Sequence, residues 1–153
     1  MCWYIRKEVT MSTVRDILEI KGHEVWTIAP EAPVFDALGA MAEKNVGALV
    51  VVDNASAVGI FSERDYARKV ELKNKNSHEL RVRDVMTFNP VFVHPGQTIE
   101  ECMEIMNGKH IRHLPVLEAQ SLVGMITIRD VVRAVISEKE HTIQHLENYI
   151  KGT

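Results

Sequence analysis

Two short segments of this 153-residue chain each place a hydroxyl, a guanidinium and a carboxylate within four positions. Their shared pattern is Gly-x-x-Ser/Thr-x-Arg-Asp, formed by Gly59, Ser62, Arg64 and Asp65 and again by Gly124, Thr127, Arg129 and Asp130. A hydroxyl at a helix N-cap, followed by an arginine in the first turn, favours a phosphate because the first backbone amides have no intrahelical partner. The short carboxylate can accept hydrogen bonds from a vicinal diol. The segments therefore indicate a site for phosphate and ribose, the polar half of a nucleotide.

The same pattern also has an explanation that requires no ligand. Ser/Thr-x-x-Asp is a variant of the capping box, in which the hydroxyl and the carboxylate bind backbone amides at the start of their own helix. The presence of Gly, hydroxyl, Arg and Asp in both copies strengthens the nucleotide interpretation. From the residues alone, both the ligand site and the helix cap stay open.

The two segments belong to a longer internal repeat. When residues 30–70 are aligned with residues 95–135 without a gap, 12 of the 41 positions are identical, whereas average composition gives roughly two or three by chance. The identical pairs are Pro30/Pro95, Met41/Met106, Lys44/Lys109, Leu49/Leu114, Val51/Val116, Ser56/Ser121, Val58/Val123, Gly59/Gly124, Arg64/Arg129, Asp65/Asp130, Arg68/Arg133 and Val70/Val135. Further upstream, Val-Arg-Asp-Ile-Leu at residues 14–18 recurs as Val-Arg-Asp-Val-Met at residues 82–86. The chain therefore contains two copies of one unit.

Each copy has the hydrophobic pattern of a strand, a helix, two strands and a second helix. Apolar residues at i, i+3, i+4 and i+7 predict one amphipathic helix through Val34, Ala37, Leu38 and Met41 and another through Ile99, Cys102, Met103 and Met106. Short apolar runs predict three strands per copy, at residues 25–28, 48–52 and 58–61 and at residues 91–93, 114–117 and 122–126. Ser62 and Thr127 begin the second helices.

These elements predict an α/β fold of two tandem β-α-β-β-α units, residues 12–72 and 80–137, joined by a polar linker around residues 73–79. A unit of about 60 residues has a marginal core when it is alone. We therefore expect the two units to pack sheet against sheet about a pseudo-twofold axis. That symmetry creates two related clefts between the units.

The two ends of the chain do not match the repeat. Residues 1–11 are predicted to form an N-terminal extension, and residues 138–153 a C-terminal helical tail. Ile143, Leu146 and Ile150 recur on one face of that tail. The pattern is equally consistent with padding of the core and with contact to a partner chain.

The repeat and its motifs resemble the CBS domain pair, also called the Bateman module. The resemblance rests on the two hinge segments, on the Val-Arg-Asp segments, on Asn-Val-Gly-Ala-Leu at residues 45–49 and on Ile-Arg-His-Leu-Pro-Val at residues 111–116. It covers about residues 12–137. Residues 62–69 and 131–137, followed by a short tail, are similar to stand-alone CBS-pair proteins of bacteria and plant mitochondria, which carry no catalytic domain.

The resemblance implies that an adenine nucleotide binds in two clefts, each between the hinge segment of one copy and the strands of the other. The first cleft would be formed by Ser62, Arg64, Asp65, Pro90, Val91, Ile111, Arg112 and His113. The second would be formed by Thr127, Arg129, Asp130, Val25, Val46, Gly47 and Ala48. Adenine would lie against the apolar strand residues of each cleft.

The two implied clefts differ in charge. Arg112 and His113 stand where the first copy has Gly47 and Ala48. Because a guanidinium and an imidazole attract phosphate, we expect the first cleft to bind a charged phosphate better than the second. With its usual pKa of about 6.5, His113 would also make binding tighter below neutral pH.

The expected function is that of a nucleotide-binding regulatory module that passes a ligand-dependent conformational change to an unidentified partner protein. The resemblance implies AMP, ATP or ADP as ligand, NAD(H) as a further ligand, and S-adenosylmethionine as a less suitable one. It also implies a homodimer formed through helices. The alternative is a ligand-independent interaction or dimerisation domain whose hinge motifs are only helix caps.

Composition and motifs argue against several other functions. A net charge of −3 supplies no general field for nucleic acid or an anionic membrane, and no apolar run reaches the roughly 18 residues of a transmembrane helix. The sequence has no P-loop, no nucleophile elbow and no Cys-x-x-Cys, so no enzyme is expected. His110 and His113 lack a third ligand for a metal. Cys102, on an apolar helix stripe, favours a free thiol and a reducing cytoplasm.

Overall fold

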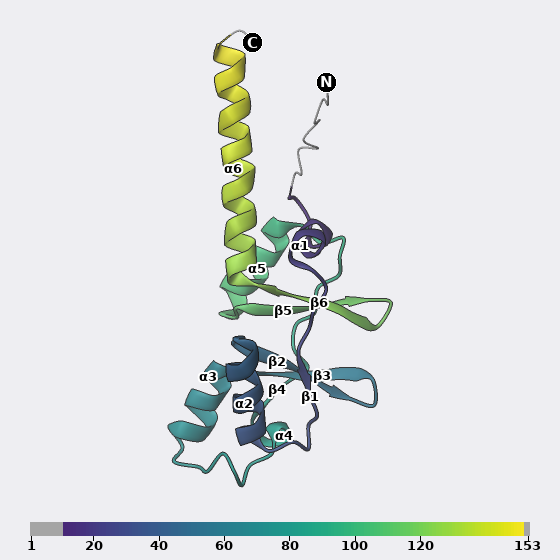
Figure 1. The fold of residues 1–153 in the computed structure, drawn as a ribbon, viewed down its shortest axis with the longest axis vertical. Coiled ribbons are helices and arrows are strands. Elements are labelled where there is room, and N and C mark those ends of the chain that lie inside the picture. The colour runs from purple at the N-terminus through teal and green to yellow at the C-terminus, as the bar shows by residue number, and fades with distance from the viewer. Residues whose placement is uncertain (1–10, 152–153) are drawn as a thin grey trace.

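The strands form two sheets that pack face to face in the computed structural model, which describes residues 11–151 (Figure 1). The first sheet has the order β1-β2-β3-β4, with the bounds Thr27–Ile28, Ala48–Asp53, Ser56–Ser62 and Thr87–Phe88. The second sheet consists of β5 (His113–Glu118) and β6 (Ser121–Thr127). Each sheet is built on one antiparallel hairpin, β2-β3 or β5-β6. Equivalent hairpins in the two repeats confirm the predicted tandem α/β units.

The two hairpins share the same irregularities. Both turn residues of each hairpin have a positive φ, at Asn54 and Ala55 and at Ala119 and Gln120. Two consecutive residues with positive φ match the twist of the flanking strands. The register shifts after Val51 in the first hairpin and after Val116 in the second. The repeat in the sequence is therefore reproduced in the detail of the backbone.

The first strand of each copy is shorter than the apolar pattern predicts. Over residues 25–28 only the two residues of β1 pair with β2, in parallel. Residues 91–93 contribute one parallel bridge, from Val93. Each segment runs into a proline, Pro30 or Pro95, which has no N–H to continue the ladder.

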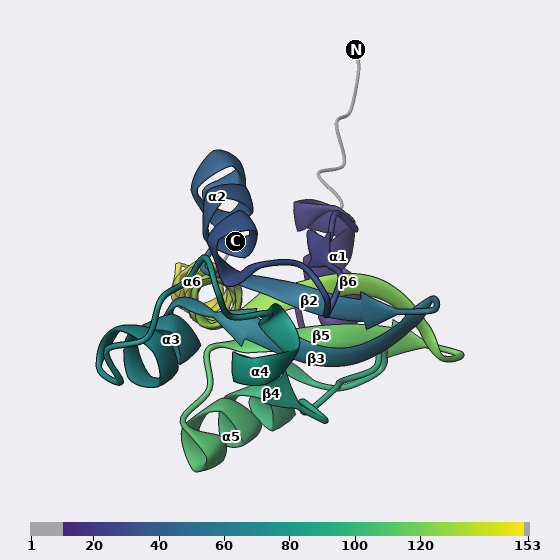
Figure 2. The ribbon, with the colours of Figure 1, turned by 90° about the horizontal axis from the view of Figure 1, so that it is seen from below.

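Helices flank the two sheets, which lie one over the other when seen from below (Figure 2). The predicted amphipathic helices are confirmed as α2 (Val34–Lys44) and α5 (Ile99–Lys109). Met103, which the spacing places on the apolar stripe of α5, is instead 41% exposed. The second helix of the first copy, α3 (Glu63–Tyr66), continues as a π-helical turn, η1 (Ala67–Glu71).

The short helices that begin each repeat pack on the core of the other repeat. Every buried residue of α1 (Val14–Lys21) belongs to a core formed with residues 93–134. Both buried residues of α4 (Val82–Val85) belong to a core formed with residues 34–70. The two hydrophobic cores therefore do not coincide with the predicted units 12–72 and 80–137. Each core includes the first helix of the other repeat, α1 or α4.

Equivalent contacts fix this exchange of helices. A backbone amide of each helix donates to a carbonyl of the opposite repeat over 2.9 Å, in the pairs Val14 to Gln97 and Val82 to Ala32. A strand glycine also lies against α1 and another against the residues that directly follow α4. A Cβ on Gly124 would lie 2.6 Å from Cδ2 of Leu18, and a Cβ on Gly59 would lie 2.7 Å from Sδ of Met86. A Cβ at either position would force the neighbouring side chain to move, so glycine allows this close approach without strain.

A third apolar cluster lies between the two sheets. Ala48, Val50 and Ile60 of the first sheet meet Met125 of the second, and all four side chains are buried. Burial of apolar surface contributes about 25 cal/mol per Å², so this cluster joins the two units into one body. The expected packing of sheet against sheet about a pseudo-twofold axis is confirmed.

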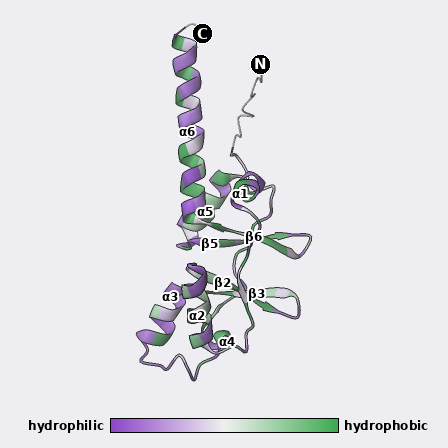
Figure 3. Cartoon of the chain, in the orientation of Figure 1, coloured by the Kyte–Doolittle hydropathy of each residue, from purple (hydrophilic) through white to green (hydrophobic). Residues whose placement is uncertain are grey.

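The predicted C-terminal tail is not a separate helix. It continues α6, which runs unbroken over Ile128–Ile150 and extends beyond the sheets (Figure 1). Ile143, Leu146 and Ile150 are at least half exposed, so they do not pad the core of their own chain. Figure 3 shows apolar positions recurring along this otherwise polar helix. Residues 152–153 of the predicted tail lie outside the described residues.

The predicted N-terminal extension of residues 1–11 is only partly covered, because residues 1–10 lie outside the described residues. Met11, its last residue, packs against the core that contains α1 and so belongs to the fold. Among the helices of residues 11–151, none combines the length and the apolar character needed to cross a membrane.

Candidate functional site

Cleft A is a cavity of about 490 Å³ between the start of α3 and the segments around β4 and β5. All eight residues predicted for the first cleft line it: Ser62, Arg64, Asp65, Pro90, Val91, Ile111, Arg112 and His113. The remaining wall comes from residues that the sequence analysis did not single out for this cleft: Gly47, Ile60, Glu63, Thr87, Asn89 and Lys109. The fold therefore brings the hinge of the first repeat against the segments that follow β4 and lead into β5.

Asp65 is a buried carboxylate, 7% exposed, with four donors around it. Its Oδ2 accepts hydrogen bonds from the backbone amide and the hydroxyl of Ser62, at 3.0 and 3.1 Å. Its Oδ1 accepts from the Thr87 hydroxyl at 3.1 Å and lies 3.0 Å from Nζ of Lys69. The Asp65 amide donates back to the Ser62 hydroxyl at 3.2 Å, which completes a capping box. A diol would have to replace Thr87 or Lys69 at Oδ1.

The N-terminus of each hinge helix offers fewer free amides than the sequence pattern suggests. The Glu63 amide donates to the Gly47 carbonyl at 3.1 Å, and the Ile128 amide donates to the Arg112 carbonyl at 2.9 Å. The amide of each capping aspartate is bound by the hydroxyl of its own N-cap residue. Two of the first amides of each helix are thus occupied, so side-chain cations must supply more of any attraction for phosphate.

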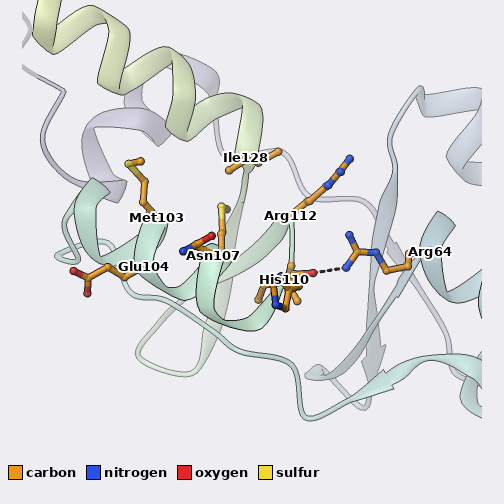
Figure 4. A pocket seen from close by; sticks show the side chains of 9 residues that line it. Arg64, Met103, Glu104, Asn107, His110, Arg112 and Ile128 are labelled. Carbon is orange, nitrogen blue, oxygen red and sulfur yellow. Dashed lines mark hydrogen bonds between the residues drawn. The ribbon is translucent and has the colours of Figure 1, made fainter.

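Three cationic side chains line cleft A: Arg64, Lys109 and Arg112. The Arg64 guanidinium reaches across from α3 and donates a hydrogen bond to the carbonyl of His110 (Figure 4). Arg64 and Arg112 also line an outer groove of about 580 Å³ on α5 and at the start of α6. The cationic part of cleft A therefore adjoins open surface.

Cleft B is a cavity of about 360 Å³ on the pseudosymmetric side of the molecule. Five of the residues predicted for the second cleft line it: Val25, Val46, Gly47, Ala48 and Thr127. Asp130 adjoins the wall through an ion pair with Lys21, one of the lining residues. Arg129 is exposed and is not among the lining residues, so it is not placed as Arg64 is in cleft A.

Cleft B contains cationic groups that the sequence analysis did not count. The expected difference in charge between the two clefts rests only on the uncharged Gly47-Ala48 pair and the equivalent Arg112-His113 pair. Nζ of Lys21 lies 2.7 Å from Oδ2 of Asp130 and donates to the Met125 carbonyl at 2.8 Å. Lys44 lies over the ring of Trp26, 4.4 Å from its centroid, and both residues line the cleft. Such a cation–π contact holds the ammonium at the cleft wall. The difference in charge between the two clefts is therefore smaller than the sequence suggests.

His113 lines both clefts. Burial lowers the pKa of its imidazole below the usual value of about 6.5, and the nearby cations Lys21, Arg112 and Arg64 lower it further, while Asp130 acts in the opposite direction. The assumption of an ordinary pKa for His113 is therefore wrong. In the described structure the imidazole is neutral at pH 7, and any charge that it adds to phosphate binding appears only at lower pH.

Some of the side chains missing from the prediction left a signal in the sequence. Lys44 and Lys109 are identical across the repeat, and the structure places them in equivalent clefts. Lys21 and Thr87 left no such signal, because they reach the opposite repeat only through the exchange of α1 and α4. Among residues 11–151, no group of three His, Cys, Asp or Glu side chains is arranged to hold a metal ion.

The protein consists of two pseudosymmetric α/β repeats, and residues from both repeats line each cleft. The chain belongs to the CBS domain family, which it matches over residues 14–72 and 82–137. Both matches lie within the repeats identified from the sequence.

Similar proteins agree with this assignment. The CBS domain-containing protein CBSX3, mitochondrial, from Arabidopsis thaliana is 36% identical over 151 residues, which covers 92% of this chain and 73% of the relative. A solved protein with CBS domains from Burkholderia ambifaria is 43% identical, with a TM-score of 0.79, over 82% of this chain and 95% of that chain. The hexameric CBS-CP12 protein from bloom-forming cyanobacteria is 28% identical, with a TM-score of 0.71, over 78% and 69%.

Proposed function

We propose that this protein is a regulatory module that binds an adenine nucleotide in clefts A and B and passes the resulting change in conformation to a partner protein. The observation that carries the proposal is cleft A itself. Its volume of about 490 Å³ lies within the usual range of about 300–1,000 Å³ for small-molecule sites. Its wall combines apolar residues with a capped carboxylate and three cations.

The chemistry of cleft A suits a nucleotide that carries phosphate. Pro90, Val91 and Ile111 offer an apolar surface for a base, and Arg64, Lys109 and Arg112 offer positive charge at the opening. We therefore favour AMP, ADP or ATP, with NAD(H) as a further ligand. S-adenosylmethionine carries a positive sulfonium instead of a phosphate, so the cationic wall makes it the least suitable of these ligands.

We further propose that the protein acts as a homodimer and without catalysis of its own. Val132, Ile136, Ile143, Leu146 and Ile150 are exposed along α6, and a second copy is the simplest partner for such a stripe. A related CBS protein is described as hexameric, which supports assembly in this family. The CBS domain model matches residues 14–72 and 82–137, and CBS domains are generally regulatory rather than catalytic, which supports a role as a sensor.

A reducing compartment fits the one cysteine in the described part of the chain. Cys102 is a buried free thiol on α5, and burial raises its pKa to about 11, so the reactive thiolate is suppressed. We propose the cytoplasm as the location. The plant relative is named as mitochondrial, and the mitochondrial matrix is also reducing.

Thermal denaturation with AMP, ATP, NADH and S-adenosylmethionine tests the proposed ligand. A nucleotide at 100 times its Kd stabilises the fold by about 2.7 kcal/mol, which corresponds to a rise in Tm of roughly 5–10 °C for a chain of this size. AMP, ATP or NADH should raise the Tm. The absence of a rise with any of the four ligands at millimolar concentration contradicts the proposal.

The competing function is a ligand-independent interaction domain, and one observation favours it. Thr13 and Asp16 form the same capping box at α1, although neither residue lines cleft A or cleft B. A capping box therefore occurs in this chain without a nucleotide site. If sedimentation shows a stable dimer and no nucleotide changes the Tm, the interaction domain is the better interpretation.

A further inference from the structure

One imidazole separates the two clefts. The His113 ring lies against Gly47, and both residues line cleft A and cleft B. A Cβ on Gly47 would lie 3.5 Å from Nε2 and 3.6 Å from Cε1 of His113. The residue equivalent to His113 in the first repeat is Ala48. The shared wall therefore contains a single titratable ring, placed on one side of the pseudo-twofold axis.

Charged groups from both clefts face this ring. They are Lys21 at the end of α1, Glu63 and Arg64 on α3, Arg112 before β5 and Asp130 on α6. The carboxylate of Glu63 approaches the same side of Gly47, with Oε2 3.8 Å from the position of its Cβ. Arg64 and Arg112 belong to cleft A, whereas Lys21 and Asp130 belong to cleft B. The charge of the ring is therefore sensitive to what occupies either cleft.

We propose that His113 couples the two clefts by taking up a proton, so that an anionic nucleotide in one cleft raises the affinity of the other. The inference rests on the proposed nucleotide binding. A phosphate beside Arg64 and Arg112 offsets their positive charge, which otherwise opposes protonation of the ring. The ring then takes one proton from the solvent, and the imidazolium attracts an anion in cleft B. By linkage, an anion in cleft B favours binding in cleft A by the same factor.

The coupling depends on pH in a defined direction. Burial and the three cations hold the pKa of unliganded His113 below the usual value of about 6.5. A bound anion raises that pKa. Proton uptake therefore requires a pH between the unliganded and liganded values. We expect coupling near pH 6 and none near pH 8, where the ring stays neutral in both states.

The sensitivity of His113 to both clefts can be measured without a nucleotide. NMR titration of the ring should show a higher pKa in Arg112→Ala and in Lys21→Ala than in the wild-type protein, because each substitution removes a cation. Lys139→Ala, an exposed position on α6, is the matched control and should leave the pKa unchanged. A ring whose pKa moves in neither cleft variant contradicts the proposal, whatever the protein binds.

The coupling itself is measured with AMP as the probe. Backbone amides of cleft A and the Trp26 indole of cleft B report each occupancy separately. In the wild-type protein near pH 6, filling one cleft should raise the affinity of the other by about fivefold or more, and the effect should vanish near pH 8. His113→Gln should show no coupling at either pH, whatever its affinity for AMP, while the exposed control His145→Gln should behave as wild type.

If His113→Gln fails to fold, the coupling is tested instead by measuring the pKa of His113 in the wild-type protein with and without AMP. Saturation with AMP must then raise the pKa of His113, and an unchanged pKa with both clefts filled overturns the coupling alone. AMP that perturbs neither cleft overturns AMP binding as the proposed function and the coupling together. The two failures are therefore distinguishable.

Discussion

Nζ of Lys21 lies 2.7 Å from Oδ2 of Asp130, although Lys21 belongs to the first repeat and Asp130 to the second. At the equivalent aspartate of cleft A the cation is Lys69, 3.0 Å from Oδ1 of Asp65 and four positions further along the same helical run. Lys21 lines cleft B, whereas Lys69 does not line cleft A. Each aspartate thus forms an ion pair with a lysine, but Lys21 comes from the opposite repeat and Lys69 from the same helical run as its aspartate.

We expect Lys21→Met to separate phosphate recognition from ribose recognition in cleft B. Loss of the ammonium should weaken AMP binding about tenfold, since a charge-assisted hydrogen bond contributes about 1.5 kcal/mol or more. Adenosine has no phosphate and should bind as well as before or better, because the Asp130 carboxylate loses one of its three donors and keeps only the amide and hydroxyl of Thr127, which leaves more room for a ribose hydroxyl. Calorimetric titration with both ligands checks this, with Lys139→Met as control. Equal losses for AMP and adenosine contradict the assignment of Lys21.

Arg112→Ala tests the cationic part of cleft A. Arg112 is exposed, so screening by solvent reduces its contribution. Near pH 8, where His113 is neutral, we expect the affinity of cleft A for AMP to fall by about threefold to tenfold, with little change in cleft B. Arg129→Ala is a suitable control, because the sequence assigns Arg129 to a cleft and the structure places it outside the wall of cleft B. If Arg129→Ala weakens AMP binding as much as Arg112→Ala does, Arg129 belongs to the wall of cleft B after all.

The capping aspartates can be compared with an aspartate that caps a helix outside both clefts. Asp16→Ala removes the α1 cap and should cost about 1 kcal/mol without affecting nucleotide binding. Asp130→Ala should cost a similar amount and also weaken binding in cleft B. Asp65→Ala should cost about 1–3 kcal/mol, because it leaves Thr87 and Lys69 without their carboxylate. Chemical denaturation and calorimetry of the three variants give both quantities.

The outcome that would favour helix capping alone is specific. In that case the Asp65 and Asp130 variants lose stability as Asp16→Ala does, yet bind AMP with wild-type affinity. A loss of affinity in the two cleft variants, and not in the α1 variant, identifies the hinge aspartates as ligand contacts.

How far the sequence predicts the site depends on where each residue comes from. The eight predicted residues of cleft A follow from the resemblance to the CBS domain pair, which places the Ser62–Asp65 segment and the Arg112-His113 pair in one cleft. Lys21 and Thr87 do not follow from it. They reach the site because α1 and α4 cross to the opposite repeat, and such an exchange depends on packing between distant segments.

The fold shows the same division. Hydrophobic periodicity predicts α2, α5 and both hairpins, because each buries a face that its own sequence defines. The length of the first strands depends on pairing with β2 or β5, and on where a proline ends that pairing, so an apolar run overestimates it. Arg129 is the clearest mismatch, since identity with Arg64 across the repeat does not give it the same surroundings.

The lowered pKa of His113 should appear in the stability of the protein without ligand. Because the folded state binds a proton at His113 less readily than the unfolded chain, His113 causes no loss of stability well above pH 6.5. As the pH falls through about 6.5, the unfolded chain takes up the proton first and stability declines. The Tm of the wild-type protein should therefore fall more between pH 7.5 and pH 5.5 than that of His113→Gln, and His145→Gln should follow the wild type.

The exchange of helices makes a prediction at the contact between Gly124 and Leu18. A Cβ on Gly124 would lie 2.6 Å from Cδ2 and 3.0 Å from Cδ1 of Leu18, so Gly124→Ala should cost about 1–3 kcal/mol through overpacking. Leu18→Ala alone should cost about 2–5 kcal/mol, because Leu18 is only 1% exposed and its removal leaves a cavity. In the double variant the alanine methyl enters the space that Leu18 vacates.

We therefore expect the double variant to lose less unfolding free energy than the two single variants lose together. The difference should be at least about 0.5 kcal/mol, the level at which residues in contact depart from additivity. Urea denaturation of the four proteins in this double-mutant cycle measures the interaction directly. Gly124→Ala combined with Ile17→Ala is the matched control, because Ile17 is buried in the same helix and is not among the atoms closest to Gly124. Strict additivity of Gly124→Ala with Leu18→Ala would mean that α1 does not pack on β6 in solution. The crossing that brings Lys21 to Asp130 would then be absent as well.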